Sequence, residues 1–203
     1  MIKNIIFDFG DIFINLDKNA PEKQFIEMGI QADLQEVTLV NQAYEVGKIT
    51  TGEFIKHYLE WLPKNTTKQA ISKAWNSMLK DFPIHRLHFL KTLNNSNKYR
   101  LFLLSNTNDL HIKWIKENIS CYDAFKAEFE KFYLSQEIGL RKPNSDCFNF
   151  VLSENELLAS ETLFIDDTKE NTDAAEILGI HTWNLQPGKE DVTDLFTLKK
   201  ELF

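Results

Sequence analysis

The sequence predicts an α/β fold in which a doubly wound parallel sheet carries a small all-helical domain inserted after the first strand. Two apolar runs that end in carboxylates, residues 3–8 and 163–167, have the composition of strands buried on both faces. Between residues 16 and 79 the pattern is helical, whereas after Pro83 strands and helices alternate. This alternation is typical of a parallel sheet that is covered by helices on both faces.

The first expected element is a strand over residues 2–8, and the helical block follows it. Within that block, Thr50-Thr51-Gly52-Glu53 has the spacing of a capping box, in which a threonine hydroxyl and a glutamate satisfy the first turn of a helix. Aromatic side chains such as Phe54, Tyr58 and Trp61 recur at helical spacing, so we expect them to pack inside the block. The sequence predicts four helices here, over residues 22–28, 34–44, 53–61 and 68–79.

The remainder of the chain supplies the alternating elements of a Rossmann-like core. We expect helices over residues 85–93, 110–118, 146–152 and 170–178, and strands over residues 100–104, 131–134, 162–165 and 180–183. The predicted domains are therefore an α/β core formed by residues 1–15 and 84–203, and a helical cap formed by residues 16–83. Because the cap is inserted after the first strand, it should lie above the carboxyl end of that strand.

Composition and charge exclude several kinds of partner. A net charge of −7 would repel nucleic acid and anionic membranes over most of the surface, so we expect neither. The two cysteines, Cys121 and Cys147, have no metal-binding or disulfide spacing, which is typical of the reducing cytoplasm. No apolar run reaches transmembrane length, and the first residues lead into a strand rather than a signal peptide. The sequence thus predicts a soluble cytoplasmic protein.

Three carboxylates are expected to meet at one edge of the sheet. Asp8 ends the first predicted strand, and Asp166 and Asp167 end the strand that begins at residue 162. Open α/β sheets bind their ligands at the carboxyl edge of the strands. A cluster of carboxylates repels itself unless a cation lies among the oxygens, and Mg²⁺ prefers oxygen ligands. Taken alone, Asp8 is explained equally well by a solvated turn, but the adjacent acids Asp166 and Asp167 favour a metal site.

Two further loops carry candidate chemistry. Ser105 and the residues after it place a hydroxyl and consecutive backbone N–H groups at a strand-to-helix junction, where a phosphate can be held. Simple capping by Asn108 or Asp109 is the alternative for that loop. Lys142, which precedes Pro143, could neutralise a phosphoryl group during transfer, although most lysines lie at the surface without a catalytic role.

The order and spacing of these segments resemble the haloacid dehalogenase-like (HAD) hydrolase superfamily. The four motifs of that superfamily correspond here to IIFDFG, LFLLSNTN, GLRKP and LFIDDTKEN, which begin at residues 5, 101, 139 and 163. The segments 132–143 and 173–180 are similar to the branch that contains bacterial α-D-glucose-1-phosphate phosphatases. The resemblance implies a Mg²⁺-dependent phosphatase that acts on a small phosphorylated metabolite, with a sugar phosphate as the expected substrate.

The resemblance also implies roles for individual residues. Asp8 would be the nucleophile that forms an aspartyl-phosphate, and Lys142 would be the second catalytic residue. Lys142 would offset negative charge on Asp8 and on the phosphoryl group, while Ser105 and Asn106 would bind phosphate oxygens. The ligands of Mg²⁺ would be Asp8, the Gly10 carbonyl, Asp167 and, directly or through water, Asp166.

One residue departs from the usual pattern of these phosphatases. Most of them carry a second aspartate two residues after the nucleophile as general acid and base, and this chain has Gly10 there. The glucose-1-phosphate phosphatase branch resembles the chain in this respect. Two alternatives therefore stay open: a haloacid dehalogenase, which also lacks the second aspartate, and a catalytically degenerate phosphate-binding or regulatory protein. The pair Asp166 and Asp167 argues against a dehalogenase, which needs no metal and binds an anionic substrate.

Overall fold

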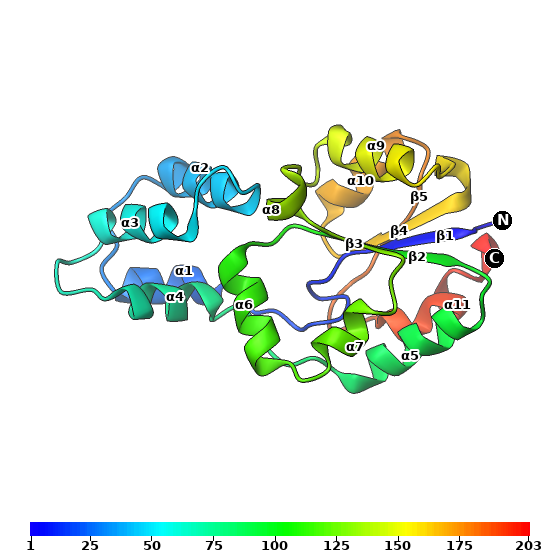
Figure 1. Cartoon of the computed structure of the whole chain (residues 1–203), viewed down its shortest axis with the longest axis horizontal. Coiled ribbons are helices and arrows are strands. Elements are labelled where there is room, and N and C mark those ends of the chain that lie inside the picture. The colour runs from blue at the N-terminus through cyan, green and yellow to red at the C-terminus, as the bar shows by residue number, and fades with distance from the viewer.

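The structure is a computed structural model that describes residues 1–203, and its centre is a five-stranded sheet (Figure 1). The strand order is β3-β2-β1-β4-β5, and every neighbouring pair is parallel. The predicted α/β class with a parallel, doubly wound sheet is confirmed. The strands are β1 (Asn4–Phe7), β2 (Arg100–Ser105), β3 (Lys131–Leu134), β4 (Thr162–Asp166) and β5 (His181–Asn184).

Alternate side chains of the central strands enter two hydrophobic clusters on opposite faces of the sheet. Ile5 and Phe7 belong to the larger cluster, which includes side chains of α5 (Ile84–Asn95) and α6 (Asp109–Asn118). Ile6 belongs to the other cluster, with side chains of α9 (Ser145–Glu154) and α10 (Lys169–Ile177). Figure 1 shows these two helix pairs on the two sides of the sheet. Burial of both faces explains why these strands are continuous apolar runs.

The register of the sheet brings the ends of three strands to the same edge. Phe7 lies opposite Leu103 of β2 and Ile165 of β4. Asp8 and Asp166, which follow directly, are therefore delivered side by side at the carboxyl edge, where Ser105 ends β2. Every candidate motif of the sequence reaches this one edge.

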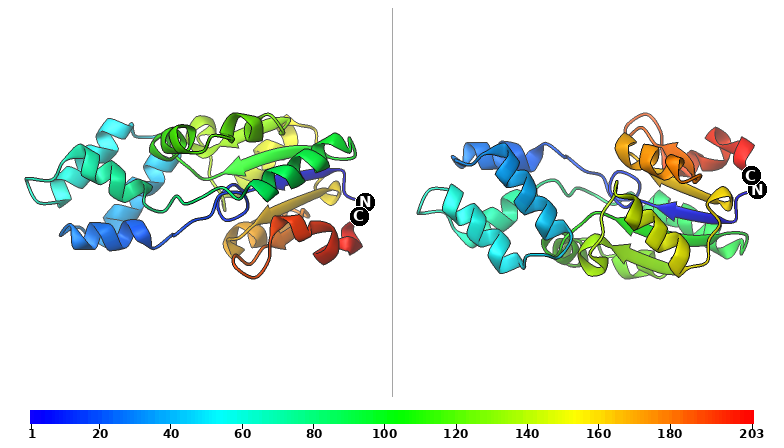
Figure 2. Two further views of the ribbon diagram at one scale, coloured as in Figure 1. Left: turned by 90° about the horizontal axis from the view of Figure 1, so that it is seen from below. Right: turned by 90° about the horizontal axis from the view of Figure 1, so that it is seen from above.

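Four helices form the insertion between β1 and α5, and they lie beyond the carboxyl edge of the sheet (Figures 1 and 2). Their aromatic side chains form a separate core that includes Phe54, Tyr58 and Trp75. The predicted capping box is present, because the Thr50 hydroxyl accepts from the Glu53 N–H and the Glu53 carboxylate accepts from the Thr50 N–H. The helices are α1 (Ala20–Glu27), α2 (Leu34–Glu45), α3 (Thr51–Trp61) and α4 (Lys68–Asn76).

Two chain segments connect the insertion to the core, and they run side by side. The Asn15 N–H donates to the Asp81 carbonyl at 2.9 Å, and the Asp17 N–H donates to the Met78 carbonyl at 2.8 Å. This pairing explains why α4 ends at Asn76 rather than at the predicted residue 79. The division into domains at residues 15/16 and 83/84 is consistent with the position of these segments and stays a prediction.

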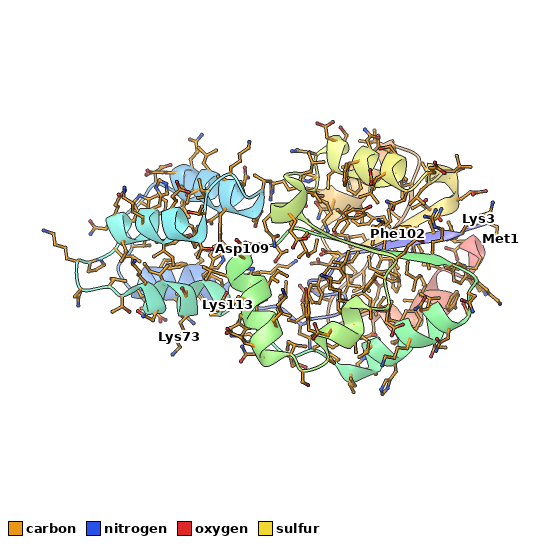
Figure 3. The ribbon with its side chains drawn as sticks, viewed as in Figure 1. Met1, Lys3, Lys73, Phe102, Asp109 and Lys113 are labelled. Atoms are coloured by element: carbon orange, nitrogen blue, oxygen red, sulfur yellow. The ribbon has the colours of Figure 1, made fainter.

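Several short helices were not predicted from the sequence, because four or five residues carry too little periodicity to be recognised. No helix in the chain combines the length and apolar content needed to cross a membrane. Figure 3 shows Phe102 among the packed side chains of the sheet and Asp109 at the start of α6, close to the insertion. The unpredicted helices are α7 (Tyr122–Lys126), α8 (Ser135–Ile138), α11 (Leu195–Leu198) and three turns of 3₁₀ helix, η1 (Ala159–Glu161), η2 (Val192–Asp194) and η3 (Lys200–Leu202).

Candidate active site

A buried lysine lies between two carboxylates at the carboxyl edge. Lys142 Nζ is 2.7 Å from Asp8 Oδ1 and 2.7 Å from Asp166 Oδ2. The Lys142 side chain is 1% exposed and that of Asp166 is 0% exposed, whereas Asp8 keeps 13% of its side-chain surface. Because an unpaired charge is costly to bury, this mutual pairing is what allows Lys142 to lie in the interior. The structure therefore brings together Asp8, Lys142 and Asp166 from three separate motifs.

Both oxygens of Asp166 are occupied by hydrogen-bond donors. Oδ1 accepts from the Thr168 N–H at 2.8 Å, Oδ2 accepts from Lys142, and the Asn171 amide donates to both oxygens at 3.0–3.1 Å. These donors hold the carboxylate in one orientation against the lysine. Asp166 is thus placed to position Lys142, and a metal contact from Asp166 would be made through water.

The remaining oxygens at this edge fit a hard divalent cation. Single carboxylate oxygens of Asp8, Asp166 and Asp167 lie within 4.8 Å of one another. Asp8 Oδ2, Asp167 Oδ1 and the Gly10 carbonyl oxygen accept no hydrogen bond within the protein. Oxygen ligands of this kind suit Mg²⁺. Asp8, Gly10 and Asp167 would hold the ion. The sequence predicts these three ligands together with Asp166, and the ligand set stays a prediction.

Burial opposes the ionisation of two carboxylates of this cluster, Asp8 and Asp167. Burial raises the pKa of Asp8 to about 7, which Lys142 opposes and the charges of Asp166 and Asp167 reinforce. Burial also raises the pKa of Asp167, against the opposing effect of Lys18. A divalent cation favours the ionised carboxylate, so binding of the ion must displace the proton.

Mg²⁺ binding is therefore expected to release a proton below pH 7. Asp8 would bind the ion in its ionised form, so the affinity for Mg²⁺ should rise by up to about tenfold per pH unit below the pKa and level off above it. Isothermal titration of the enzyme with Mg²⁺ in buffers of different ionisation enthalpy, at pH 6 and at pH 8.5, measures this. Proton release should approach one per ion at pH 6 and vanish at pH 8.5; the same release at both pH values would contradict the assignment.

Ser105 and Asn106 lie at the end of β2, and their side chains differ in their hydrogen bonds. The Ser105 hydroxyl forms no hydrogen bond within the protein, although the residue is only 4% exposed. The Asn106 side chain is fully used, because Nδ2 donates to the Lys142 carbonyl at 2.8 Å and Oδ1 accepts from the Lys142 N–H at 2.9 Å. Asn106 thus fixes the backbone of Lys142, and a contact with phosphate would come from its main-chain N–H, which is unpaired in the protein.

Lys18 is a cation at this edge that sequence reasoning missed. Its ammonium contacts Asp167 Oδ2 and lies 3.5 Å from Asp11 Oδ2. The only signal in the sequence was its place in the segment that leads to the insertion, which is uninformative without the fold. Lys18 neutralises part of the acid cluster from the side of the insertion.

A cavity of 480 Å³ is lined mainly by residues of the insertion, and the core contributes Asn106 and His111 to it. Its volume is in the range of small-molecule binding sites. Because Asn106 lines it and also holds the Lys142 backbone, the cavity adjoins the Asp8–Lys142–Asp166 cluster. Other residues that line it include Lys18, Asn41, Glu45 and His111.

The insertion is hydrogen-bonded to the start of α6 beside this cavity. Asn108 caps α6 by accepting the His111 N–H at 3.1 Å, so the capping alternative for this loop is confirmed for Asn108. The same Asn108 oxygen accepts from Trp75 Nε1 at 3.2 Å, and the His111 ring stacks on Trp75. Burial lowers the pKa of His111 to about 4, so the ring is neutral at pH 7.

The fold and the site together define a hydrolase of the haloacid dehalogenase-like type. The chain belongs to this family, because residues 5–185 match the family described as Haloacid dehalogenase-like hydrolase. Both the fold class and the family predicted from the motifs are confirmed.

Two curated relatives and one solved structure are similar over nearly the whole chain. A D-ribitol-5-phosphate phosphatase of Bacteroides thetaiotaomicron is 30% identical, covering 94% of this chain and 95% of the relative. A glyceraldehyde 3-phosphate phosphatase of Methanocaldococcus jannaschii is 26% identical, with coverages of 96% and 90%. A HAD family enzyme of B. thetaiotaomicron, solved with magnesium and inorganic phosphate, has a TM-score of 0.81 and 37% identity, with coverages of 94% and 97%.

Proposed function

We propose that the chain is a Mg²⁺-dependent phosphatase that hydrolyses a small phosphorylated sugar or polyol. The main observation in support of this proposal is that the Lys142 ammonium lies between the carboxylates of Asp8 and Asp166, beside a cavity of 480 Å³. The names of the two curated relatives support a sugar or polyol phosphate as substrate. The relative that binds magnesium and phosphate supports the metal. The glucose-1-phosphate phosphatase branch stays a prediction.

The chemistry follows from the position of the side chains. An oxygen of Asp8 attacks the phosphorus in line with the leaving oxygen and forms an aspartyl-phosphate. Lys142 offsets the negative charge shared by Asp8 and the transferring group, while the Ser105 hydroxyl and the Asn106 N–H donate to phosphoryl oxygens. Mg²⁺, when bound by Asp8, Gly10 and Asp167, supplies further charge neutralisation. Water then attacks the phosphorus, which releases phosphate and restores Asp8.

The leaving oxygen receives no proton from a carboxylic acid at position 10. A Cβ at Gly10 would lie 2.6 Å from Leu16 Cδ1, so the Leu16 side chain would have to shift to admit a second aspartate. Asp11 does not replace it, because Asp11 Oδ1 accepts from the Leu16 N–H at 2.9 Å. The leaving group therefore departs with more negative charge, which favours acidic leaving groups.

Turnover of phosphate esters in the presence and absence of Mg²⁺ tests the proposal. The enzyme should hydrolyse p-nitrophenyl phosphate, whose leaving group is acidic, and a panel of sugar and polyol monophosphates, each only with the divalent ion. Turnover of a haloacid without metal would instead identify a dehalogenase. Binding of inorganic phosphate without any ester hydrolysis would identify a degenerate phosphate-binding protein. The intact pair of Asp8 and Lys142 argues against this hypothesis.

We also propose that the enzyme works in the cytoplasm on a small metabolite, without nucleic acid as a partner. Both cysteines are free thiols, which agrees with a reducing compartment. The net charge of −7 supports the absence of a nucleic-acid surface.

A further inference from the structure

The cavity between the insertion and the sheet has two chemically different ends. Lys18 and Asn106 line it beside the acid cluster, where a phosphate would lie. Glu22 of α1 and Asn41 and Glu45 of α2 line it on the side of the insertion. The side of the cavity formed by the insertion, called the far end below, would therefore receive the part of the substrate that is not phosphate. Its polar residues lie among apolar side chains such as Phe25, Ile30 and Trp75.

Glu45 is held at the far end by an arginine next to the lysine of the active site. Arg141 Nη2 is 3.0 Å from Glu45 Oε2, and Arg141 Nε donates to the same oxygen at 3.1 Å. The second oxygen, Oε1, has no partner in the protein. Since Arg141 precedes Lys142 in the chain, this pair sets the distance between α2 and the reacting groups.

The end of α2 is also fixed against the core by its backbone. Gly47 has a φ of +67°, and a Cβ there would lie 2.5 Å from the Gln136 carbonyl oxygen. Figure 1 shows the end of α2 against α8, the helix that contains Gln136. Glu45 therefore projects from a helix end that has little freedom to withdraw.

Asn41 lies one turn before Glu45 on α2 and also lines the cavity. Its Oδ1 accepts from the Tyr58 hydroxyl at 2.9 Å, which fixes the amide, and its Nδ2 forms no hydrogen bond within the protein. A fixed amide donor beside a carboxylate acceptor is complementary to neighbouring hydroxyl groups, each of which both donates and accepts.

The charged groups that line the far end are the carboxylates of Glu45, which is paired with Arg141, and of Glu22, which forms no salt bridge. The lining contains no cation except Lys18, which is held by Asp167 at the other end. His111 also lines the cavity but is neutral at pH 7 because its pKa is about 4. A substrate with a second anionic group would place that group against these carboxylates.

We propose that Asn41 and Glu45 select substrates whose non-phosphorylated part is neutral and hydroxylated, and that Glu45, together with Glu22, rejects a carboxylate or second phosphate at that end. This inference rests on the proposed phosphatase function and assigns its specificity. Glu45 binds substrate hydroxyl groups through Oε1, while its Oε2 stays paired with Arg141.

The test compares two substrates that differ only at the far end: D-ribitol 5-phosphate, and D-ribonate 5-phosphate, in which a carboxylate replaces the terminal hydroxymethyl group. Wild-type kcat/KM should favour the neutral ester by about tenfold or more, as like charges in a partly enclosed site disfavour binding. In Glu45→Gln this ratio should fall at least about fivefold, mainly through a lower KM for the carboxylate ester, because Arg141 becomes unpaired. The double variant Glu22→Gln/Glu45→Gln should lower it further.

Two controls separate specificity from structure and from activity itself. Glu36→Gln makes the same change in charge at an exposed position of α2 and should leave the ratio unchanged. If Glu45 only held the insertion to the core, Glu45→Gln would lower kcat/KM equally for both esters and for p-nitrophenyl phosphate, and the inference would be refuted. Two further results with a wild-type enzyme that hydrolyses p-nitrophenyl phosphate would refute the inference. One is equal kcat/KM for the neutral and the carboxylate ester, and the other is no hydrolysis of the neutral ester. Failure of all three substrates would refute the phosphatase function itself.

Discussion

Asp8→Asn is expected to lower kcat by on the order of 10³-fold or more, because the amide keeps the shape of the side chain but removes the nucleophile. The fold should be retained, since Lys142 keeps its contact with Asp166 at 2.7 Å. Steady-state kinetics with p-nitrophenyl phosphate at saturating Mg²⁺ measure the loss, and a thermal melt followed by circular dichroism reports the fold.

Asp173→Asn is the matched control for this variant. Asp173 is an aspartate on the exposed side of α10, where it pairs only with Lys169. Its substitution should leave kcat unchanged within about twofold, as expected for a surface change. Turnover of folded Asp8→Asn within a few-fold of the wild type would show that another residue is the nucleophile.

The second large effect is expected on the metal. Asp167→Ala removes a proposed ligand of Mg²⁺, whose Oδ1 accepts no hydrogen bond within the protein. Mg²⁺ affinity and kcat/KM at fixed Mg²⁺ should each fall by on the order of 10²-fold or more. A chelator should abolish wild-type activity, and added Mg²⁺ should restore it. Isothermal titration with Mg²⁺ measures the affinity independently of turnover.

Two outcomes would count against the metal assignment. Full activity of the chelated wild-type enzyme would favour the dehalogenase reading, in which the carbon-directed nucleophile needs no ion. Unchanged Mg²⁺ affinity in Asp167→Ala would place the ion elsewhere. Asp11→Asn serves as the control, because Asp11 lies in the same region but is not a proposed metal ligand, and its Oδ1 accepts a hydrogen bond from the Leu16 N–H.

The fold could be predicted from the sequence because its signals are local. Continuous apolar strands such as β4 mark a sheet that is buried on both faces, and the order of strands and helices determines a parallel arrangement. The capping box at Thr50 identified the start of α3 for the same reason. Short helices such as α8 were missed because their boundaries depend on tertiary contacts.

The convergence of Asp8 and Asp166 could be expected because both stand at the carboxyl ends of parallel strands, whereas Lys142, in the loop between α8 and α9, was connected to them only by the family resemblance. The partners that orient them could not be expected. Asn106 was assigned to phosphate binding, yet its side chain is occupied by the Lys142 backbone. The contact of Lys18 with Asp167 joins residues that are far apart in the chain, and no local pattern reports such a pair.

Position 10 shows how packing explains an apparent defect of the sequence. The motif alone shows that the second aspartate is absent, whereas the structure shows that Leu16 packs close to Gly10 and would have to shift to admit a side chain there. The proposed specificity role of Glu45 was equally hidden, because Glu45 lines the cavity and pairs with Arg141 of the core only in the folded chain.

Trapping the covalent intermediate tests the central claim most directly. Enzyme quenched with acid during turnover is treated with borohydride, which reduces an acyl phosphate to an alcohol and so converts a phosphorylated aspartate into homoserine. We predict homoserine at position 8, detected by mass spectrometry of the peptide that contains it, only when both substrate and Mg²⁺ were present. Homoserine at another position, or its absence at position 8 in enzyme quenched while turning over, would contradict the assignment of Asp8 as the nucleophile.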